Sequence, residues 1–294
     1  MAFFSIVIPL YNKENYIENT LKSVLAQTFT DFEILIINDG STDFSEAKVL
    51  QFADSRIKYH SRENEGASAA RNFGIDSAKS NYITFLDADD YWYPEFLQTM
   101  FQNIEAFPEE KVFSAAIETE TPKKIFGAEY SIDKTAQVQV VDYFPASFKE
   151  TAICTSCAVF HKSVFEKVGN FDTTIRSGQD TDLWIRIGLV YKVVFDWKIL
   201  ARYVFDAKSL SKNKSYSKTR IRFEKFAEAE KVNPDLKKFL DLNRYSIAIK
   251  SKINGDFAYF KTLCNEINLV NLSVRKKMLL FTPRFLLRIL IRLK

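Results

Sequence analysis

The sequence of 294 residues predicts an α/β fold, in which a mostly parallel sheet has helices on both faces and a helical extension follows. Apolar strand patterns alternate with amphipathic helix patterns up to about residue 205, which is typical of a parallel sheet. Past that point the strand signals fade and helical periodicity takes over, interrupted at Pro234, Gly255 and Pro283. A chain of this length accommodates one sizeable domain and an appendage.

The expected strands of the N-terminal part are short apolar runs, and a helix or a turn follows each of them. After the first strand, Ile17, Leu21 and Val24 share one face of an amphipathic helix. Thr42 starts the next helix with a capping side chain, and Pro94 opens a later one, as a proline in the first turn can. The expected strands are 3–8, 32–37, 56–60, 82–86 and 112–117, and a further helix is expected over 66–78.

Residues 118–150 show only weak patterns, and we expect variable loops there. Regular structure is expected again at 152–160, followed by a turn at 169–172 and a helix that starts at Asp180. These signals place a first domain at 1–205 and a helical extension at 206–294.

The charge of the chain is unevenly divided. Residues 206–294 contain 21 basic and 8 acidic residues, a net charge of +13. Residues 1–205 contain 20 basic and 29 acidic residues, a net charge of −9, so the whole chain has a net charge of +4. Nucleic acid and an anionic membrane are the two partners that suit such a basic segment.

The residue pattern at 275–294 favours an anionic membrane as the partner of the basic segment. We expect no nucleic acid as partner. Basic and apolar side chains alternate there, without any acid, as in a helix that lies on an anionic membrane surface. A helix that packs against the first domain, or against a second copy in a homodimer, is the other possibility. The basic face has Arg284, Arg288 and Arg292, and the apolar residues are Phe285, Leu286, Ile289, Leu290 and Leu293.

The N-terminus and the cysteines indicate a cytoplasmic protein. Met1 and Ala2 lead directly into the first expected strand, with no sign of a secretory signal. No apolar run approaches the roughly 20 residues that a transmembrane helix needs. Three cysteines are too few for a disulfide framework. We therefore expect a cytoplasmic protein that is peripheral on the inner face of the cytoplasmic membrane.

Four short segments with acidic or amide side chains occur in order along the first two-thirds of the chain. The third places carboxylates directly after an apolar strand, at the edge where open α/β sheets bind ligands. Such hard oxygen ligands suit Mg²⁺ or Mn²⁺. One Asp-x-Asp is also common in solvated turns, but the ordered set indicates a site for a nucleoside diphosphate and a metal. The segments are Ile8-Pro9-Leu10-Tyr11-Asn12, Asn38-Asp39-Gly40-Ser41-Thr42-Asp43, Leu86-Asp87-Ala88-Asp89-Asp90 and Gly178-Gln179-Asp180.

This ordered set resembles the family 2 glycosyltransferases, which are inverting enzymes with the GT-A fold. The resemblance covers about residues 3–211 and includes Asn64-x-Gly66-x-Ser68-x-Ala70-Arg71-Asn72 between the second and third segments. It implies a nucleotide-sugar half at 1–117, an acceptor half at 118–205 and a UDP-sugar as donor substrate.

The resemblance and the residue chemistry agree at the nucleotide. The carboxylate of Asp39 can accept the imide N–H of uracil, which cytosine does not offer. Pro9 and Tyr11 would flank the base, with the Tyr11 ring as a flat apolar face. The resemblance also implies Asn64 and Gly66 as nucleotide-binding residues.

The remaining polar residues suit the diphosphate, the metal and the reaction. Arg71 can pair with the diphosphate or hold Asp87, because a guanidinium binds oxyanions in a bidentate manner. Asp87 would meet the ribose and Asp89 the metal, Mn²⁺ or Mg²⁺. Asp180 matches the family's general base, which takes the proton of the acceptor hydroxyl. Trp184, one turn further on, either faces the acceptor sugar or packs in the core.

Two positions depart from the family pattern. Gln179 stands where a glutamate is common, so the charge beside Asp180 is lost. Many relatives have a histidine shortly before a Ser-x-Ser motif, and Asp206 takes that position here. Because an aspartate is also able to bind a divalent cation, Asp206 is a second candidate metal ligand.

The sequence thus predicts an inverting, metal-dependent hexosyl- or N-acetylhexosaminyltransferase that acts on a glycan or a lipid-linked saccharide. A non-catalytic module that binds sugar nucleotides is the alternative from another class, and Gln179 and Asp206 are its best support. A nucleotidyltransferase is less expected, because it normally has a Gly-rich basic triphosphate loop, which Asn12-Lys13-Glu14-Asn15 is not.

Overall fold

The chain folds into two compact units, residues 1–221 and 222–294. The computed structural model describes residues 2–206 and 220–292, so the Ser-x-Ser at 209–211 and Leu293 lie outside it. The boundary between the units falls later than residue 205, because the backbone N–H of Ile221 donates to the carbonyl of Ser177, and Arg220 pairs with Ser177 in a β-bridge.

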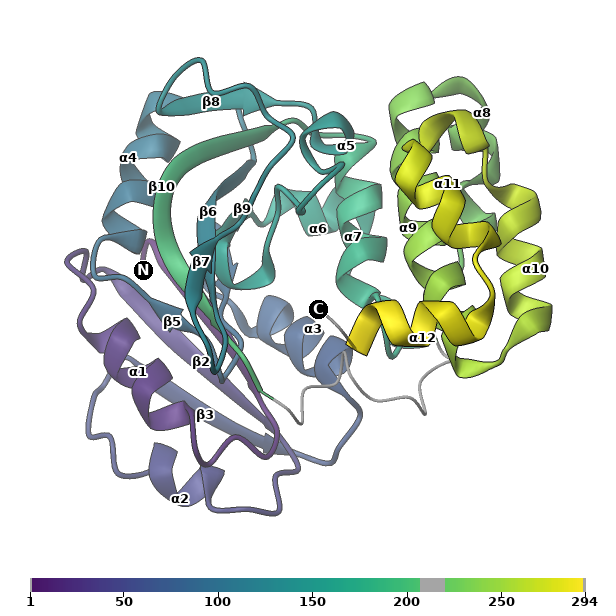
Figure 1. The fold of residues 1–294 in the computed structure, drawn as a ribbon. Helices are drawn as coiled ribbons and strands as arrows, with labels where there is room; N and C mark the ends of the chain where they lie inside the picture. Colours follow the sequence, from purple (N-terminus) through teal and green to yellow (C-terminus); the bar gives the residue numbers. More distant parts are fainter. Residues whose placement is uncertain (1, 207–219, 293–294) are drawn as a thin grey trace. The chain divides into compact units, whose positions relative to one another are not determined.

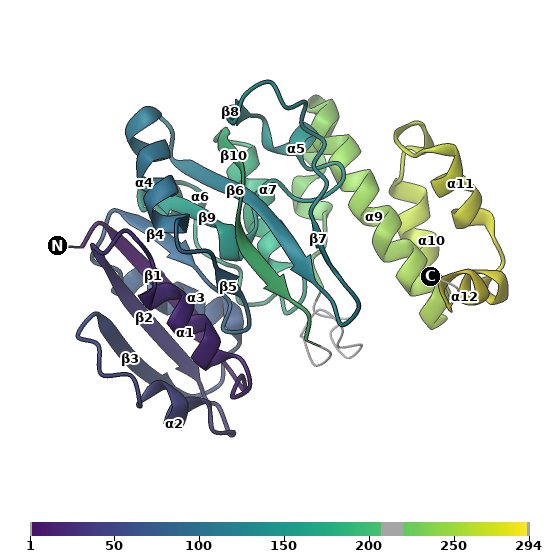
Figure 2. The ribbon, with the colours of Figure 1, turned by 60° about the vertical axis from the view of Figure 1, so that its left-hand side comes forward.

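Unit 1 is built around one mixed sheet of ten strands among the described residues (Figures 1 and 2). The strands are β1 (Phe4–Leu10), β2 (Phe32–Asp39), β3 (Ile57–Arg62), β4 (Tyr82–Phe85), β5 (Tyr91–Trp92), β6 (Val112–Glu120), β7 (Ile125–Gly127), β8 (Val138–Val141), β9 (Ala158–His161) and β10 (Val193–Val204). Their order is β3-β2-β1-β4-β9-β6-β10-β5, with β7 beside β6 and β8 beside β10.

Most of the long strands point in one direction. The strands β1, β2, β3 and β4 pair in parallel, β9 runs against both β4 and β6, and β10 is parallel to β6. The carboxyl ends of β1, β2, β4 and β10 therefore meet at the same edge of the sheet. In open α/β sheets this edge is where ligands bind.

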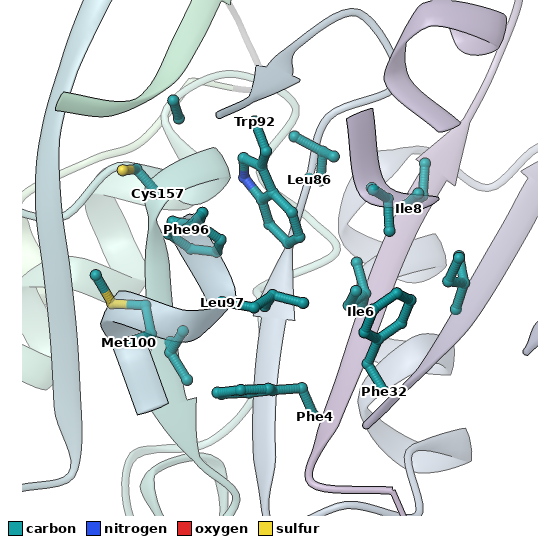
Figure 3. Close-up of a cluster of buried hydrophobic side chains, with 14 of the residues drawn as sticks. Phe4, Ile6, Ile8, Phe32, Leu86, Trp92, Phe96, Leu97, Met100 and Cys157 are labelled. Atoms are coloured by element: carbon teal, nitrogen blue, oxygen red, sulfur yellow. The ribbon is translucent and has the colours of Figure 1, made fainter. Parts of the chain in front are cut away.

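Helices cover both faces of this sheet. The helices of unit 1 are α1 (Ile17–Leu25), α2 (Ser45–Val49), α3 (Ala67–Ser77), α4 (Phe96–Ala106), α5 (Tyr143–Ala146), α6 (Ser163–Val168) and α7 (Gln179–Gly188), with a 3₁₀ turn at Thr155–Cys157. Residues from α1 and α4 pack with Ile6 and Ile8 of β1 in one apolar cluster, in which Figure 3 shows Leu97 and Met100. The helix α3 packs against the other face, close to Val7. Nearly every residue of β1 and β2 is buried, as parallel strands between two helical layers require.

The second half of unit 1 differs from the sequence expectation. Residues 118–150 are not only loops, because they hold the end of β6, the short strands β7 and β8, and α5. The regular structure expected at 152–160 is a 3₁₀ turn at Thr155–Cys157 followed by β9, which starts at Ala158. The twelve-residue β10 was not expected at all. Its pairing with β6 is irregular around Ile199, and such irregularities break the alternation that identifies a strand.

Unit 2 is helical, as expected. Its helices are α8 (Ala227–Val232), α9 (Pro234–Asn254), α10 (Phe257–Glu266), α11 (Val274–Phe281) and α12 (Arg284–Arg292), with 3₁₀ turns at Glu224–Phe226 and Leu269–Asn271. Pro234 opens α9, and Gly255 ends it in a left-handed conformation. Pro283 separates α11 from α12, so the single helix expected over 275–294 is two helices.

A small core of Ala248, Leu263, Ile267, Leu272 and Leu280 holds α9, α10 and α11 of unit 2 together. In the described parts of both units, no helix has the length and apolar character that crossing a membrane requires.

Candidate functional site

A cavity of about 560 Å³ lies at the edge where β1, β2, β4 and β10 end, beside the start of α7. A second cavity, of about 470 Å³ beside Asp196 and Trp197, contains none of the candidate site residues. The first one is lined by all ten of them. They are Pro9, Tyr11, Asp39, Asn64, Gly66, Arg71, Asp87, Asp89, Asp180 and Asp206.

Asp39 is buried at the end of β2 and holds the loop that leads into α3. Its Oδ1 accepts from the backbone N–H of Glu65 at 2.9 Å, and its Oδ2 from that of Gly66 at 2.8 Å. Its carbonyl accepts from Nδ2 of Asn64 at 2.8 Å. Gly66 has φ +96°, a backbone conformation that strains any residue with a Cβ, so glycine is favoured there. Asn64 and Gly66 thus contact Asp39, whose two oxygens keep lone pairs for a ligand.

Tyr11 lies on the loop after β1, and 44 % of its surface is exposed. The next residue, Asn12, has φ +51° and ties this loop to the loop after β2. Its backbone N–H donates to Oγ of Ser41 at 3.1 Å, and its Oδ1 accepts from the N–H of Thr42 at 2.8 Å. The Tyr11 ring beside Pro9 is therefore open to a flat ligand rather than packed in the core.

Arg71 joins two carboxylates in the cavity, and we call Arg71, Asp87 and Asp180 the arginine cluster. Nη2 of Arg71 lies 2.6 Å from Oδ1 of Asp87, and Nη1 lies 3.3 Å from Oδ1 of Asp180. Burial lowers the pKa of the guanidinium, but the two carboxylates outweigh that effect and raise it. Of the two roles considered for Arg71, the contact with Asp87 is present, and the contact with Asp180 is additional.

Asp180 lies in the first turn of α7, which follows Gly178 at φ +87°. The N–H groups at a helix start stabilise the ionised form of a carboxylate there. Burial raises the pKa of Asp180, the charge of Arg71 opposes that shift, and Asp87 adds to it. The side chain keeps 37 % of its surface open. The cavity therefore contains an accessible carboxylate that is more basic than usual.

Lys13 joins the other two carboxylates, and we call Lys13, Asp89 and Asp206 the lysine cluster. Its Nζ lies 2.6 Å from Oδ2 of Asp89 and 2.6 Å from Oδ2 of Asp206. Burial lowers the pKa of the ammonium, but the two carboxylates outweigh that effect and raise it. Lys13 had not been singled out from the sequence, because its partners follow β4 and β10, far along the chain.

Asp89 and Asp206 fit a shared divalent ion, because each turns one oxygen toward the same position. Mg²⁺ is commonly bound by one or two carboxylates together with substrate phosphates and water. Among the described residues, no group of three or more His, Cys, Asp or Glu side chains converges on one point. The donor set therefore suits an ion that completes its coordination with a diphosphate.

Asp90 is a buried carboxylate whose hydrogen bonds hold neighbouring parts of the site in place. It is 2 % exposed, accepts from Oγ of Ser156 at 2.5 Å and from the N–H of Val204 at 3.0 Å. Oγ of Ser156 in turn accepts from the backbone N–H of Asp87 at 3.2 Å. Burial, with the charges of Asp87 and Asp89, raises the pKa of Asp90 well above its usual value. Asp90 thus links the end of β4 to the end of β10 and fixes both.

Trp184 is a core residue and does not face the cavity. It is 3 % exposed, and its ring stacks on Phe160 with centroids 5.2 Å apart. Besides Lys13, several lining residues had not been found from the sequence, among them Tyr203, which belongs to the unexpected β10, and Arg176, which lies in a turn without a motif.

The chain is similar in sequence to known glycosyltransferases. An uncharacterized glycosyltransferase of Rickettsia conorii is 38 % identical over 184 residues, which is 62 % of this chain and 30 % of that protein. The Escherichia coli protein WfgD, a UDP-Glc:alpha-D-GlcNAc-diphosphoundecaprenol beta-1,3-glucosyltransferase, is 45 % identical over 89 residues, or 30 % of this chain and 35 % of WfgD.

The fold also matches a solved structure. S. aureus TarS 1–349 in complex with UDP-GlcNAc superposes with a TM-score of 0.61 at 19 % identity, over 78 % of this chain and 64 % of TarS 1–349. The chain spans less than two thirds of each of these three proteins. The sequence model of glycosyl transferase family 2 matches residues 5–169. Since this is more than half of the chain, the protein belongs to glycosyl transferase family 2 and has the GT-A fold that its sequence predicted.

Proposed function

We propose that the chain is an inverting glycosyltransferase, which moves a hexose or N-acetylhexosamine from UDP to a hydroxyl of a glycan or lipid-linked saccharide. The observation that carries this proposal is the lining of one cavity. A buried acid lies there with an exposed aromatic ring, two carboxylates that converge on one cation, and a further carboxylate at a helix start.

Asp39 and Tyr11 would bind the uracil. The backbone N–H groups of Glu65 and Gly66 donate to the carboxylate of Asp39 and hold it in place, so the carboxylate is preorganised to accept the imide proton. The open ring of Tyr11 would lie against the base. Asp87, fixed by Arg71, would meet the ribose.

Asp180 would act as the general base. In a single displacement the acceptor hydroxyl attacks the anomeric carbon opposite the leaving diphosphate, and a carboxylate within hydrogen-bond reach takes its proton. Burial raises the basicity of Asp180, and Arg71 orients it while keeping it ionised. A divalent ion between Asp89 and Asp206 would neutralise the leaving diphosphate.

Two relatives support a UDP-linked donor. TarS 1–349 was solved with UDP-GlcNAc bound, and WfgD is named as a transferase from UDP-Glc to a diphosphoundecaprenol-linked sugar. We extend the donor class, and a lipid-linked acceptor, to this chain as part of the proposal.

The rival functions make different use of the same residues. A non-catalytic module has no need of a basic carboxylate, whereas Asp180 remains beside the substituted Gln179 and faces the cavity. A nucleotidyltransferase binds a triphosphate with a basic glycine-rich loop. The loop after β1 instead directs Lys13 to two carboxylates.

A nucleotide screen followed by a transfer assay tests the proposal. Thermal shift with Mn²⁺ should show stabilisation by UDP and by one UDP-sugar, because a ligand that binds only the folded state raises its stability. Release of UDP should then require an acceptor, tested with lipid-linked saccharides. Binding of a UDP-sugar without turnover on any acceptor would favour the non-catalytic module, and stabilisation by no uridine nucleotide would refute the donor class.

We also propose that α11 and α12 attach the protein to the anionic inner face of the cytoplasmic membrane. Arg284 and Arg288 donate to the carbonyl of Ile253 near the end of α9, and Leu287 is buried. The predicted arginine face is thus partly engaged with α9, and apolar side chains other than Leu287 are exposed. The exposed apolar residues are Val274, Met278 and Phe281 of α11 and Phe285, Leu286, Ile289 and Leu290 of α12.

Point substitutions test this attachment better than truncation, since Leu280 of α11 belongs to the core of unit 2. The joint change of Phe285, Leu286, Ile289 and Leu290 to serine should abolish flotation with anionic vesicles, because apolar area drives such binding. Val232→Ser, at an 84 % exposed site on α8, is the control and should float like the natural protein. Equal flotation of all three proteins would exclude this surface.

A further inference from the structure

The lysine cluster places a cation of the chain itself at the proposed metal position. Nζ of Lys13 lies at 2.6 Å from one oxygen each of Asp89 and Asp206, and all three side chains are mostly buried. These oxygens are the ones that a divalent ion would need. Because a divalent ion and an ammonium repel each other at such short range, both cannot occupy this position at once.

The side chain of Lys13 is suited to leave its position between Asp89 and Asp206. An ammonium on a flexible stem is a single point of charge, whereas the guanidinium of Arg71 grips two carboxylates with a planar fork. The backbone of Lys13 is fixed independently of its side chain, because its N–H donates to Oγ of Ser45 at 2.8 Å. The side chain is therefore able to swing while the loop after β1 stays in place.

We propose that Lys13 is an exchangeable counter-ion of the metal site. Before the metal binds, its ammonium neutralises Asp89 and Asp206 and holds the ends of β4 and β10 together. A divalent ion displaces the ammonium, which then pairs with the diphosphate of the donor in the same cavity. Lys13 is thus a positioning residue that couples metal binding to nucleotide binding. This inference rests on the metal site assigned under the proposed function.

The exchange predicts that Lys13 weakens metal binding in the absence of nucleotide. In calorimetric titrations of the full chain with Mn²⁺ alone, Lys13→Met should bind Mn²⁺ about tenfold more tightly than the natural protein, because no ion pair has to be broken. Lys13→Arg keeps the competing charge and should show no such gain. Lys22→Met, which removes an exposed lysine paired with Glu18, is the control and should change nothing.

The exchange also predicts that UDP strengthens Mn²⁺ binding, since the diphosphate receives the displaced ammonium. The factor by which UDP raises Mn²⁺ affinity should shrink severalfold in Lys13→Met, because this coupling is reciprocal between the two ligands. An affinity for Mn²⁺ alone that is unchanged or lower in Lys13→Met would overturn the proposal.

A second measurement uses the natural protein and does not depend on the folding of a variant. Acetylation of lysines, followed by mass spectrometry, should modify Lys13 faster once Mn²⁺ is added without nucleotide, while Lys22 reacts at a constant rate. Unchanged labelling of Lys13 while Mn²⁺ binds would contradict the displacement.

Two further variants separate this inference from the metal site itself. If Asp89→Asn and Asp206→Asn leave Mn²⁺ affinity unchanged, the metal assignment fails, and the exchange fails with it. If both variants weaken Mn²⁺ binding but Lys13→Met does not strengthen it, the metal site stands and the exchange alone is wrong.

Discussion

The arginine cluster and the lysine cluster share one plan, because in each a single cation joins two carboxylates at the ends of strands or helices. They differ in the cation. Arg71 is 4 % exposed and approaches Asp87 and Asp180 with two separate nitrogens, whereas Lys13 is 18 % exposed and offers one nitrogen to both of its partners. The buried guanidinium of Arg71 holds its two carboxylates in a fixed geometry. The ammonium of Lys13 is a single point of charge that another cation is able to replace.

In the proposed mechanism this difference suits the two clusters to different parts of the reaction. The arginine cluster holds Asp180, which would have to keep its position while it removes a proton. The lysine cluster holds the proposed ligands of an ion that would enter and leave with the nucleotide. Variants of each cluster should therefore fail in different ways.

The largest effect is expected at the base of the arginine cluster. Asp180→Asn keeps the size of the side chain and removes the proton acceptor, so transfer should fall by roughly 10²–10⁴ while UDP affinity changes little. Initial rates and calorimetry measure the two quantities. Asp182→Asn is the matched control on the same helix, because its carboxylate is buried against Arg186 and does not line the cavity. Near-normal transfer by Asp180→Asn would show that Asp180 is not the general base.

The next largest effect is expected on removal of the metal from the lysine cluster. EDTA, or Asp89→Asn, should lower transfer by about a hundredfold or more, because the charge of the leaving diphosphate is no longer neutralised. Added Mn²⁺ or Mg²⁺ should restore the chelated protein and not the variant. Full activity in EDTA would contradict the assignment of the lysine cluster as a metal site. The two clusters would then have no functional difference.

A smaller effect, with a characteristic pH dependence, is expected from Arg71→Met. Transfer at neutral pH should fall roughly 10- to 100-fold, because Asp180 loses its orienting partner. Burial raises the pKa of Asp180 and Arg71 opposes that rise, so without Arg71 the pKa should rise further. Since the base must be ionised, the pH at which activity is lost on acidification should move upward.

The control for this variant is Arg56→Met, which removes an arginine that pairs with Asp54 outside the cavity. It should leave the pH profile unchanged. A profile of Arg71→Met with the same acid limb as the natural protein would show that Arg71 does not act on Asp180.

The smallest effect is expected at Asp39, which belongs to neither cluster. UDP should bind about tenfold more tightly than CDP, since a hydrogen bond to a charged acceptor is at stake, and Asp39→Ala should erase this preference. The ratio is the informative quantity, because loss of the contacts to Glu65 and Gly66 would weaken both nucleotides together. An unchanged ratio would mean that Asp39 only shapes the loop.

That the candidate site residues lie together was largely predictable from the sequence. Asp39 ends the buried strand β2, Asp87 and Asp89 lie shortly after β4, and parallel strands bring such positions to one edge. The family resemblance then suggested the role of Asp180 and added Asp206, and both line the same cavity. The start of α7 at Gln179 was also expected within one residue.

The cation between Asp89 and Asp206 was not predictable in the same way. Lys13 lies 76 and 193 residues from its two partners, and a pairing over such separations leaves no local pattern. The strand β10, which carries Tyr203 and ends just before Asp206, is irregular in its pairing and therefore does not alternate cleanly. The sequence did not decide whether Trp184 faces the acceptor sugar or packs in the core. Helical periodicity shows which residues share a face, but not which element packs against that face.

The stereochemistry of transfer tests the central claim most directly, since a single displacement assisted by Asp180 must invert the anomeric carbon. With the donor and acceptor found in the screen, nuclear magnetic resonance of the anomeric proton gives the configuration of the new bond. We predict the configuration opposite to that of the sugar in the UDP-linked donor. A product that retains the donor's configuration would contradict both the single displacement and the assignment of Asp180 as its base.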